Sequence, residues 1–204
     1  MVSVNHLKSK GSLTGATEDE DQGDGAGNNN ETRKLAAEAL AAWLATDPTG
    51  AGSERVVILG DMNSYEKEDP IDEILAGADG VLGTEDDYVN LVDALDPDAY
   101  SYLFDGQIGT LDYIFGSQKL MNELVSAGIW NTNADEIPQF DYNDDVRDPS
   151  EQSYEEEPDG NPLYEPNAFR SSDHDAVVVD FLLNGAPEED EVFVASAGAQ
   201  SFTL

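Results

Sequence analysis

Cysteine is absent from the 204 residues of this chain, which excludes disulfide bridges and thiolate metal sites. Histidine occurs only twice, at His6 and His174. Long apolar runs are also missing: none approaches the roughly 18–20 residues that a membrane-spanning helix requires, so we expect no membrane span. Basic residues are scarce, because 9 lysines and arginines stand against 44 aspartates and glutamates, which leaves a formal charge of −35 at pH 7.

This acidic charge limits the partners of the chain, because it repels nucleic acids and anionic lipids at long range when salt is low. One interpretation is halophilic adaptation, in which a carboxylate-rich surface stays hydrated in a salty medium. Another is that acidic loops bind Ca²⁺ or Mg²⁺. Residues 78–87 combine carboxylates with glycines but lack EF-hand spacing, and a solvated acidic turn is the alternative there.

Local patterns predict strands that alternate with helices and long loops. Apolar residues make up 39% of the chain, enough for one domain or part of a larger one. Strands are predicted at residues 2–7, 56–59, 100–104, 110–115 and 175–182, and helices after Asn30 and at residues 70–76. Residues 131–168 are expected to be mostly loop, and residues 184–204 an acidic tail or linker. This order of elements predicts an α/β or α+β domain.

The first helix has a predicted start and a predicted apolar face. Asn30 is a suitable N-cap residue. Six apolar residues then recur at helical spacing on one face: Leu35, Ala36, Ala39, Leu40, Trp43 and Leu44.

Four short polar clusters lie on or beside predicted strands, where open α/β proteins build their sites. The clusters are Asn5-His6, Gly60-Asp61-Met62-Asn63, Leu111-Asp112-Tyr113 and Ser172-Asp173-His174-Asp175. Taken alone, an aspartate after a strand is more often a turn residue than a ligand, and a single histidine is more often a plain surface or core residue. Both histidines of the chain lie in these clusters, however, and the joint pattern favours a catalytic site.

The order N-H-L-K-S-K, G-D-M-N, G-T-L-D-Y-I-F and S-S-D-H-D resembles the endonuclease/exonuclease/phosphatase family, the deoxyribonuclease I-like hydrolases. Within it, N-H-L-K-S-K-G and D-G-Q-I-G-T-L-D-Y resemble the large bacterial extracellular nucleases. The resemblance covers residues 2–182. It implies a four-layer α/β sandwich, with two mixed sheets packed face to face and helices outside.

The resemblance also implies roles for the matching residues. Asp173 would be a carboxylate ligand of a divalent metal, Mg²⁺ or Mn²⁺. Asp61 would be a second metal-site residue and would bind or polarise the nucleophilic water, and Asn63 would hydrogen-bond a phosphate oxygen. His174 would contact the scissile phosphate or activate the attacking water, with Asp112 holding its other ring nitrogen. The remaining histidine, His6, would lie on the leaving-group side.

The chemistry of phosphodiester cleavage supports these residue types independently. The anionic phosphate requires a hard cation on oxygen ligands, a base of near-neutral pKa and hydrogen-bond donors. Three of the nine basic residues, Lys8, Lys10 and Arg170, lie within four residues of a histidine in these clusters, which suggests a local cationic patch for phosphate. The alternative is that these residues merely flank loops.

Two departures from the family pattern matter. The family's early strands carry an Asn and a metal-binding Glu that have no match here, so the resemblance implies that residues 1–183 correspond to the C-terminal portion of the domain. The missing N-terminal half would then lie in the same or another chain. The second departure is Ala176, where the family usually has proline.

The sequence therefore predicts a metal-dependent phosphodiester hydrolase, an extracellular or cell-surface nuclease that acts on DNA, with RNA as a further candidate substrate and Ca²⁺ as a candidate structural ion. The alternatives are a phosphomonoesterase or lipid phosphodiesterase of the same superfamily, or an inactive cation-binding fragment.

Overall fold

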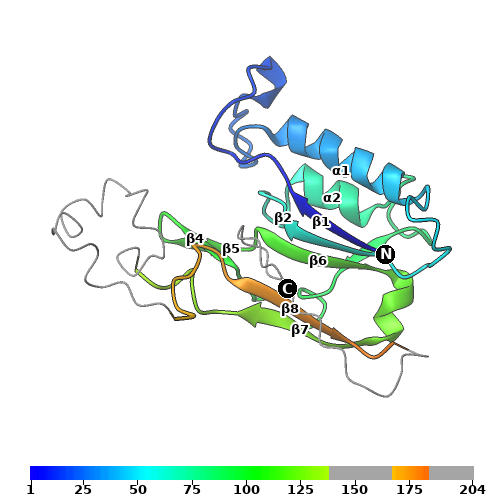
Figure 1. The fold of residues 1–204 in the computed structure, drawn as a ribbon. Coiled ribbons are helices and arrows are strands. Elements are labelled where there is room, and N and C mark those ends of the chain that lie inside the picture. Colours follow the sequence, from blue (N-terminus) through cyan, green and yellow to red (C-terminus); the bar gives the residue numbers. More distant parts are fainter. Residues whose placement is uncertain (138–166, 184–204) are drawn as a thin grey trace.

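The structure, a computed structural model, describes residues 1–137 and 167–183, whose elements form three layers (Figure 1). Two helices, α1 (Asn30–Leu44) and α2 (Asp69–Leu75), lie on one face of a four-stranded sheet with the order β1-β2-β6-β3. A two-stranded sheet of β7 and β8 packs on the other face. The predicted mixed α/β class is confirmed.

The central sheet is mixed in direction. It consists of β1 (Val2–His6), β2 (Val57–Asp61), β3 (Tyr88–Asn90) and β6 (Asp112–Ser117). Strands β1 and β2 run parallel, whereas β6 is antiparallel to both β2 and β3. The second sheet pairs β7 (Leu124–Trp130) with β8 (Ala176–Phe181) in antiparallel fashion. Two short 3₁₀ helices, η1 (Thr17–Asp19) and η2 (Gln118–Asn122), lie in the connecting segments.

The apolar runs of β2 and β6 are buried because both faces of these strands are covered. On β2, Ile58 packs towards the helices and Leu59 towards the second sheet. On β6, Phe115 and Ile114 divide in the same way. The apolar run at residues 56–59 is therefore a doubly buried strand, as its sequence predicts.

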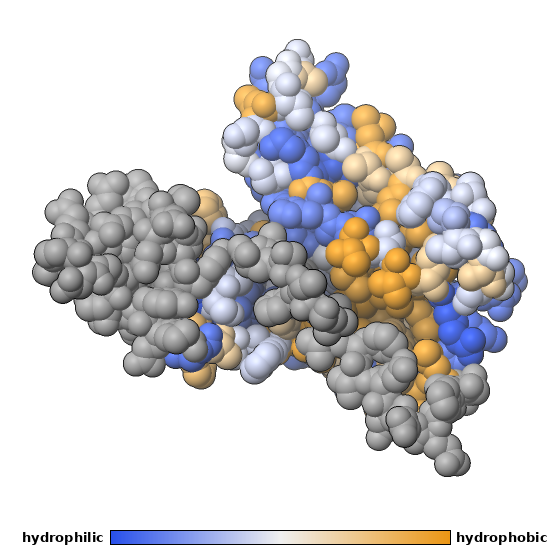
Figure 2. All heavy atoms as spheres, in the orientation of Figure 1, coloured by the Kyte–Doolittle hydropathy of each residue, from blue (hydrophilic) through white to orange (hydrophobic). Residues whose placement is uncertain are grey.

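Strand β1 forms one edge of the central sheet and is less well covered. Its Ser3 is buried, but Val2 and Val4 are 64% and 76% exposed. Among the described residues, β1 pairs only with β2. Figure 2 shows hydrophobic surface over the position that β1 occupies in Figure 1. In residues 1–137 and 167–183, this edge therefore presents apolar side chains and a backbone with no second neighbouring strand.

Helix α1 differs from its predicted start and face. It is preceded by Asn29 in a left-handed conformation (φ 62°) whose side chain does not cap it. Instead, Asp19 from η1 accepts hydrogen bonds from the backbone N–H and hydroxyl of Thr32, at 2.9 and 2.6 Å. The buried residues of α1 are Arg33, Ala37, Ala41 and Leu44, whereas Leu35 and Trp43 are each 53% exposed. The prediction of an Asn30 cap and of Leu35 and Trp43 on the buried face is wrong, because the helix turns Arg33 inwards.

Residues 102–109 form a tight hairpin with its turn at Asp105-Gly106, and strand β6 follows it. Strands β4 (Tyr102–Phe104) and β5 (Gln107–Gly109) pair with each other, and β6 joins the central sheet. Asp105 and Gly106 both have left-handed φ values, 49° and 76°, as the shortest hairpin turns require. Residues 131–137 and 167–168 are loop, as predicted, while the rest of the predicted loop and the predicted tail at 184–204 lie outside the described residues. No helix in the described ranges is long and apolar enough to cross a membrane.

Candidate active site

Strand register aligns three polar side chains at one edge of the central sheet, where β1 and β2 end and β6 begins. His6 on β1 pairs with Asp61 on β2, and Asp61 pairs with Asp112 on β6. The chain reaches Asp61 through Gly60, whose φ is 132°. A Cβ atom at Gly60 would lie 1.8 Å from the carbonyl oxygen of Asn5, so this position requires glycine.

Asp112 and His174 form the hydrogen-bonded pair that the sequence predicts. His174 Nδ1 lies 2.6 Å from Asp112 Oδ2, and the carboxylate is fully buried. The Ser101 hydroxyl donates to the same oxygen at 2.7 Å and accepts the backbone N–H groups of Leu111 and Asp112. Because Nδ1 is committed to Asp112, Nε2 is the ring nitrogen left for a water or a phosphate.

Burial and charge shift the pKa values of this pair. Burial alone would lower the pKa of His174, but the hydrogen bond and negative charge of Asp112 raise it to about 9. Burial raises the pKa of Asp112 to about 6, an effect that its bond to His174 partly offsets. At neutral pH the pair is therefore an imidazolium and a carboxylate.

Asp61 connects the pair to His6 and Asn63. The imidazole Nε2 of His6 lies 3.3 Å from Asp61 Oδ2, and its side chain is 62% exposed. Asn63, in a left-handed conformation, donates its backbone N–H to Asp61 Oδ1 at 2.7 Å. Its side-chain amide donates to Asp61 Oδ2 and to the carbonyl of Leu7, at 3.0 and 3.1 Å. To donate to a phosphate, Asn63 must exchange one of these bonds.

A loop that the sequence did not single out holds His174 in place. Asp175 is buried, and its Oδ1 accepts the backbone N–H groups of Thr132, Asn133 and Ala134 at 2.8–3.2 Å. Asn133 in turn donates its side-chain amide to the carbonyl of His174 at 2.8 Å. Asp175 lies within the S-D-H-D cluster, so the cluster contains both a site residue and its anchor.

The predicted phosphate ligands and the predicted metal ligand occupy less uniform positions. Lys8 is half-buried, and its ammonium group donates to the carbonyl of Ser9. Lys10 bonds to Glu68, and burial lowers its pKa. Arg170 donates to the carbonyl of Asn133 at 3.2 Å. Asp173 is exposed and contributes to the raised pKa of His174.

The donor atoms present fit a hard divalent cation. Asp61, Asp112 and His174 bring one donor atom each within 4.8 Å of one another, and the two carboxylates are the oxygen ligands of this group when His174 is protonated. Asp112 Oδ1 is buried and has no hydrogen-bond partner among the described residues. A buried oxygen without a donor is costly unless a ligand satisfies it. Asp173, the metal ligand that the resemblance implies, is not part of this group.

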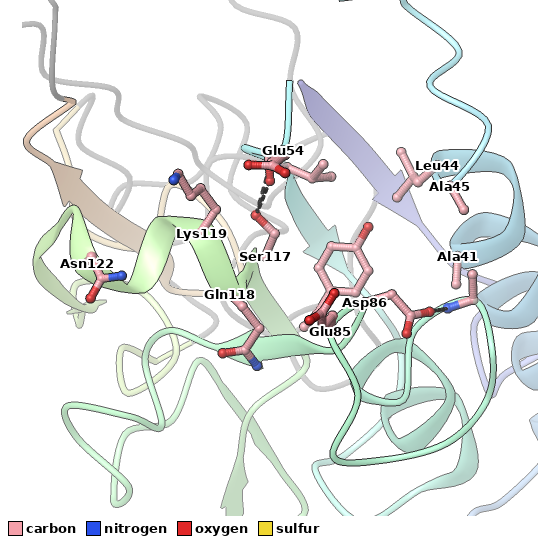
Figure 3. Close-up of a pocket in the computed structure, with 13 residues that line it drawn as sticks. Ala41, Leu44, Ala45, Glu54, Glu85, Asp86, Ser117, Gln118, Lys119 and Asn122 are labelled. Atoms are coloured by element: carbon pink, nitrogen blue, oxygen red, sulfur yellow. Dashed lines mark hydrogen bonds between the residues drawn. The ribbon is translucent and has the colours of Figure 1, made fainter. Parts of the chain in front are cut away.

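An acidic turn and a cavity lie away from the candidate active site. In residues 78–87, Asp86 Oδ2 accepts the backbone N–H groups of Ala78 and Asp79, at 2.7 and 3.0 Å. Its carboxylate therefore stabilises the turn itself. Beside it lies a cavity of about 500 Å³ (Figure 3). Its lining includes Val56 and Ser117, at the ends of β2 and β6 opposite to Asp61 and Asp112, so it is separate from the candidate active site.

Comparison with known proteins adds no relative: no family model matches the chain, and no curated protein matches it. The candidate site is therefore identified from its geometry alone. That geometry combines two carboxylates, an imidazolium and a second, exposed imidazole at one sheet edge. Sequence reasoning missed Ser101 and Asn133, whose contacts to the pair span 11 and 41 residues of chain.

Proposed function

We propose that this chain hydrolyses phosphodiester bonds with the help of a divalent cation, as an extracellular or cell-surface nuclease of the endonuclease/exonuclease/phosphatase family. The observation that carries the proposal is the convergence of Asp61, Asp112 and His174 from three distant segments. Such a group meets the needs of phosphodiester cleavage, because it can neutralise phosphate charge and hold a water.

Asp61 and Asp112 would hold the cation, Mg²⁺ or Mn²⁺, through their carboxylate oxygens, with Asp173 close enough to His174 to add to the negative field. When bound, the cation would neutralise charge on the phosphate and acidify a coordinated water. Asp61 is only 14% exposed and is held by Asn63, so it is also suited to orient the attacking water.

His174 is best suited to contact the phosphate. Its pKa of about 9 makes it an imidazolium at pH 7, and Nε2–H can then donate to a phosphate oxygen. The carboxylate of Asp112 stabilises this charged form and orients the ring. His6 is more exposed and bonds to Asp61, which suits a proton donor for the leaving oxygen.

A complementing polypeptide segment would complete both the sheet and the site. Support comes from the open edge of β1, where Val2 and Val4 are exposed. A cation held by Asp61 and Asp112 also leaves coordination positions open, which water, the phosphate or a ligand from such a segment would fill. We propose that this segment belongs to the same or another chain.

The test is cleavage of plasmid DNA and of RNA with Mg²⁺ at high salt. We expect His174→Ala to lower the rate about 10²–10⁴-fold, the usual contribution of a proton-transferring or charge-stabilising side chain. Asp61→Asn should lower it comparably. The matched control is Asp98→Asn, an exposed loop aspartate outside the site.

Each result has a distinct meaning. Equal rates for the wild type and His174→Ala would contradict the proposal. Hydrolysis of phosphomonoesters or phospholipids alone would favour those substrates over nucleic acid. A rate that rises when an upstream-extended chain is used would support the complementing segment, and an unchanged rate would contradict it.

A further inference from the structure

The β4–β5 hairpin carries a short row of aromatic rings that begins at the candidate active site. The ring of Tyr102 lies 4.5 Å from the ring of His174, centroid to centroid, and the two residues also form a β-bridge. Two residues further along β4, Phe104 lies on the same face of the hairpin. Its ring is within 11° of parallel to that of Tyr102, with 6.3 Å between centroids.

The turn and the packing of the hairpin position this row. Its two-residue turn is fixed by the left-handed conformations of Asp105 and Gly106. Behind β5, the ring of Tyr65 packs directly against Gly109, where a Cβ atom would lie 2.6 Å from Tyr65 Cε1. Tyr65 is in turn covered by Lys10, whose Nζ lies 4.8 Å from the ring centroid. Packing against the rest of the site therefore fixes the direction in which the row points.

The outer end of the row is open. Phe104 is 63% exposed, whereas the Tyr102 ring is partly covered by His174. The exposed phenyl ring of Phe104 keeps apolar surface in water beside the candidate site and adds nothing to the core. Two residues advance about 6.6 Å along a strand, close to two steps of 3.4 Å between stacked bases. The spacing therefore suits a ligand with a flat aromatic part on these rings and another part bound at His174.

We propose that Tyr102 and Phe104 form a stacking platform for an unpaired nucleobase of the substrate, so that the enzyme prefers single-stranded nucleic acid. This proposal rests on the proposed phosphodiesterase function and adds the form of the substrate. A paired base is already stacked within a duplex and hides its face, whereas an unpaired base can lie on an aromatic ring.

Charge explains why such a platform is needed. The chain's charge of −35 repels a polyanion, and salt that screens this repulsion also weakens contacts between lysine and phosphate. Stacking does not depend on net charge. The platform therefore supplies the part of substrate affinity that persists at high salt.

The experiment compares Phe104→Ala with Leu103→Ala. Leu103 is the neighbouring residue on the opposite face of β4, paired with Ile108 and itself exposed, so it controls for general effects on the hairpin. Each protein is tested on a mixed-sequence single-stranded oligonucleotide and on an abasic strand with the same sugar–phosphate backbone, both at high salt. The readouts are KM and kcat with Mg²⁺, and binding by fluorescence anisotropy in EDTA.

For Phe104→Ala we expect KM and Kd on the base-bearing strand to rise about 5- to 150-fold, which corresponds to about 1–3 kcal/mol. We expect little change in kcat, no change on the abasic strand and no change for Leu103→Ala. Unchanged KM and Kd for Phe104→Ala on the base-bearing strand would overturn the platform. An equal loss on the abasic strand would overturn it too, because the residue would then act on structure alone.

The binding arm separates this proposal from the proposed function. If neither the wild type nor an upstream-extended chain cleaves any strand, the hydrolase proposal fails. A base-dependent loss of binding in Phe104→Ala would still support the platform, and its absence would overturn it. If cleavage is normal but independent of Phe104, the hydrolase stands and the platform falls.

Discussion

Asp112 and His174 determine which chemistry is available at this sheet edge at neutral pH. A buried imidazole would ordinarily lose its proton, but the carboxylate 2.6 Å away keeps His174 protonated. Ser101 and the backbone hold that carboxylate in place. The pair is therefore an ion pair with no net charge, in which the imidazolium Nε2–H is held as a charged hydrogen-bond donor.

The first prediction concerns the titration of His174. Because the chain has two histidines, its imidazole resonances are easily resolved, and His6→Gln assigns them. In metal-free protein we expect His174 to titrate at a pKa of about 9. In Asp112→Asn we expect its pKa to fall below the ordinary value of about 6.5, because burial remains and the carboxylate is gone.

The same shift has a consequence for stability. Because the folded-state pKa of His174 is raised, its contribution to the free energy of unfolding is fully present below about pH 6.5 and is lost as the pH rises through about 9. Asp98→Asn should leave the titration unchanged. A His174 pKa that is the same in the wild type and in Asp112→Asn would contradict the assignment.

Residue types and strand ends were sufficient to predict most of the site. Asp61, Asp112 and His174 follow or begin apolar runs, so their placement at a sheet edge was accessible from sequence. Ser101, Tyr102 and Asn133 were not, because their roles arise from contacts made by loops and a hairpin whose partners are distant in the chain. Local patterns carry no record of such contacts.

At the scale of elements, Arg33 joins helix α1 to the loops that carry the site. Its guanidinium is fully buried and donates to the Ser64 hydroxyl at 2.9 Å and to the carbonyls of Lys8, Ala26 and Asn28 at 2.8–3.3 Å. Glu68, 7% exposed, neutralises it. Ser64 directly follows Asn63, so one side chain ties the loop after β1 to the loop after β2.

The second prediction tests this connection with Arg33→Met. Removing the guanidinium leaves Glu68 paired with Lys10 and takes away the donor to the carbonyls of Lys8 and Asn28, so we expect the free energy of unfolding to fall by about 2–4 kcal/mol. Urea unfolding measures this change. The matched control is Lys34→Met on the same helix, whose ion pairs with Glu38 and Glu73 are partly exposed and should be worth less than about 1 kcal/mol. Equal effects of the two substitutions would refute the role of Arg33.

Arg33 also explains why the predicted face of α1 was wrong. Periodicity assigns charged residues to solvent, and it therefore placed Leu35 and Trp43 inside. The structure buries Arg33 because loops supply several carbonyl acceptors, and the helix rotates accordingly. Strands β2, β6 and β8 were easier to predict because their burial follows directly from continuous or alternating apolar residues.

For the whole molecule, the strongest electrostatic influence is the charge of −35. Some carboxylates are bound within the fold: Asp19 accepts bonds from α1, and Glu123 pairs with Arg55. With nine basic residues against 44 acidic ones, however, the basic side chains are too few to neutralise most of the carboxylates. Folding brings these charges closer together, so their repulsion opposes the compact state.

The last prediction is that salt stabilises the chain by screening this repulsion. The screening length falls from about 10 Å at 0.1 M to about 3 Å at 1 M salt, so most of the gain should come below about 1 M. If screening is worth about 2 kcal/mol, the melting temperature should rise by about 4–8 °C, since 1 kcal/mol corresponds to about 2–4 °C in a chain of this size. Thermal melts in a NaCl series measure the curve, and a sucrose series is the control because an excluded solute stabilises without screening. Saturation in NaCl and a steady rise in sucrose are expected. A steady rise of equal slope in both would show that solute exclusion, not charge, links this protein to salt.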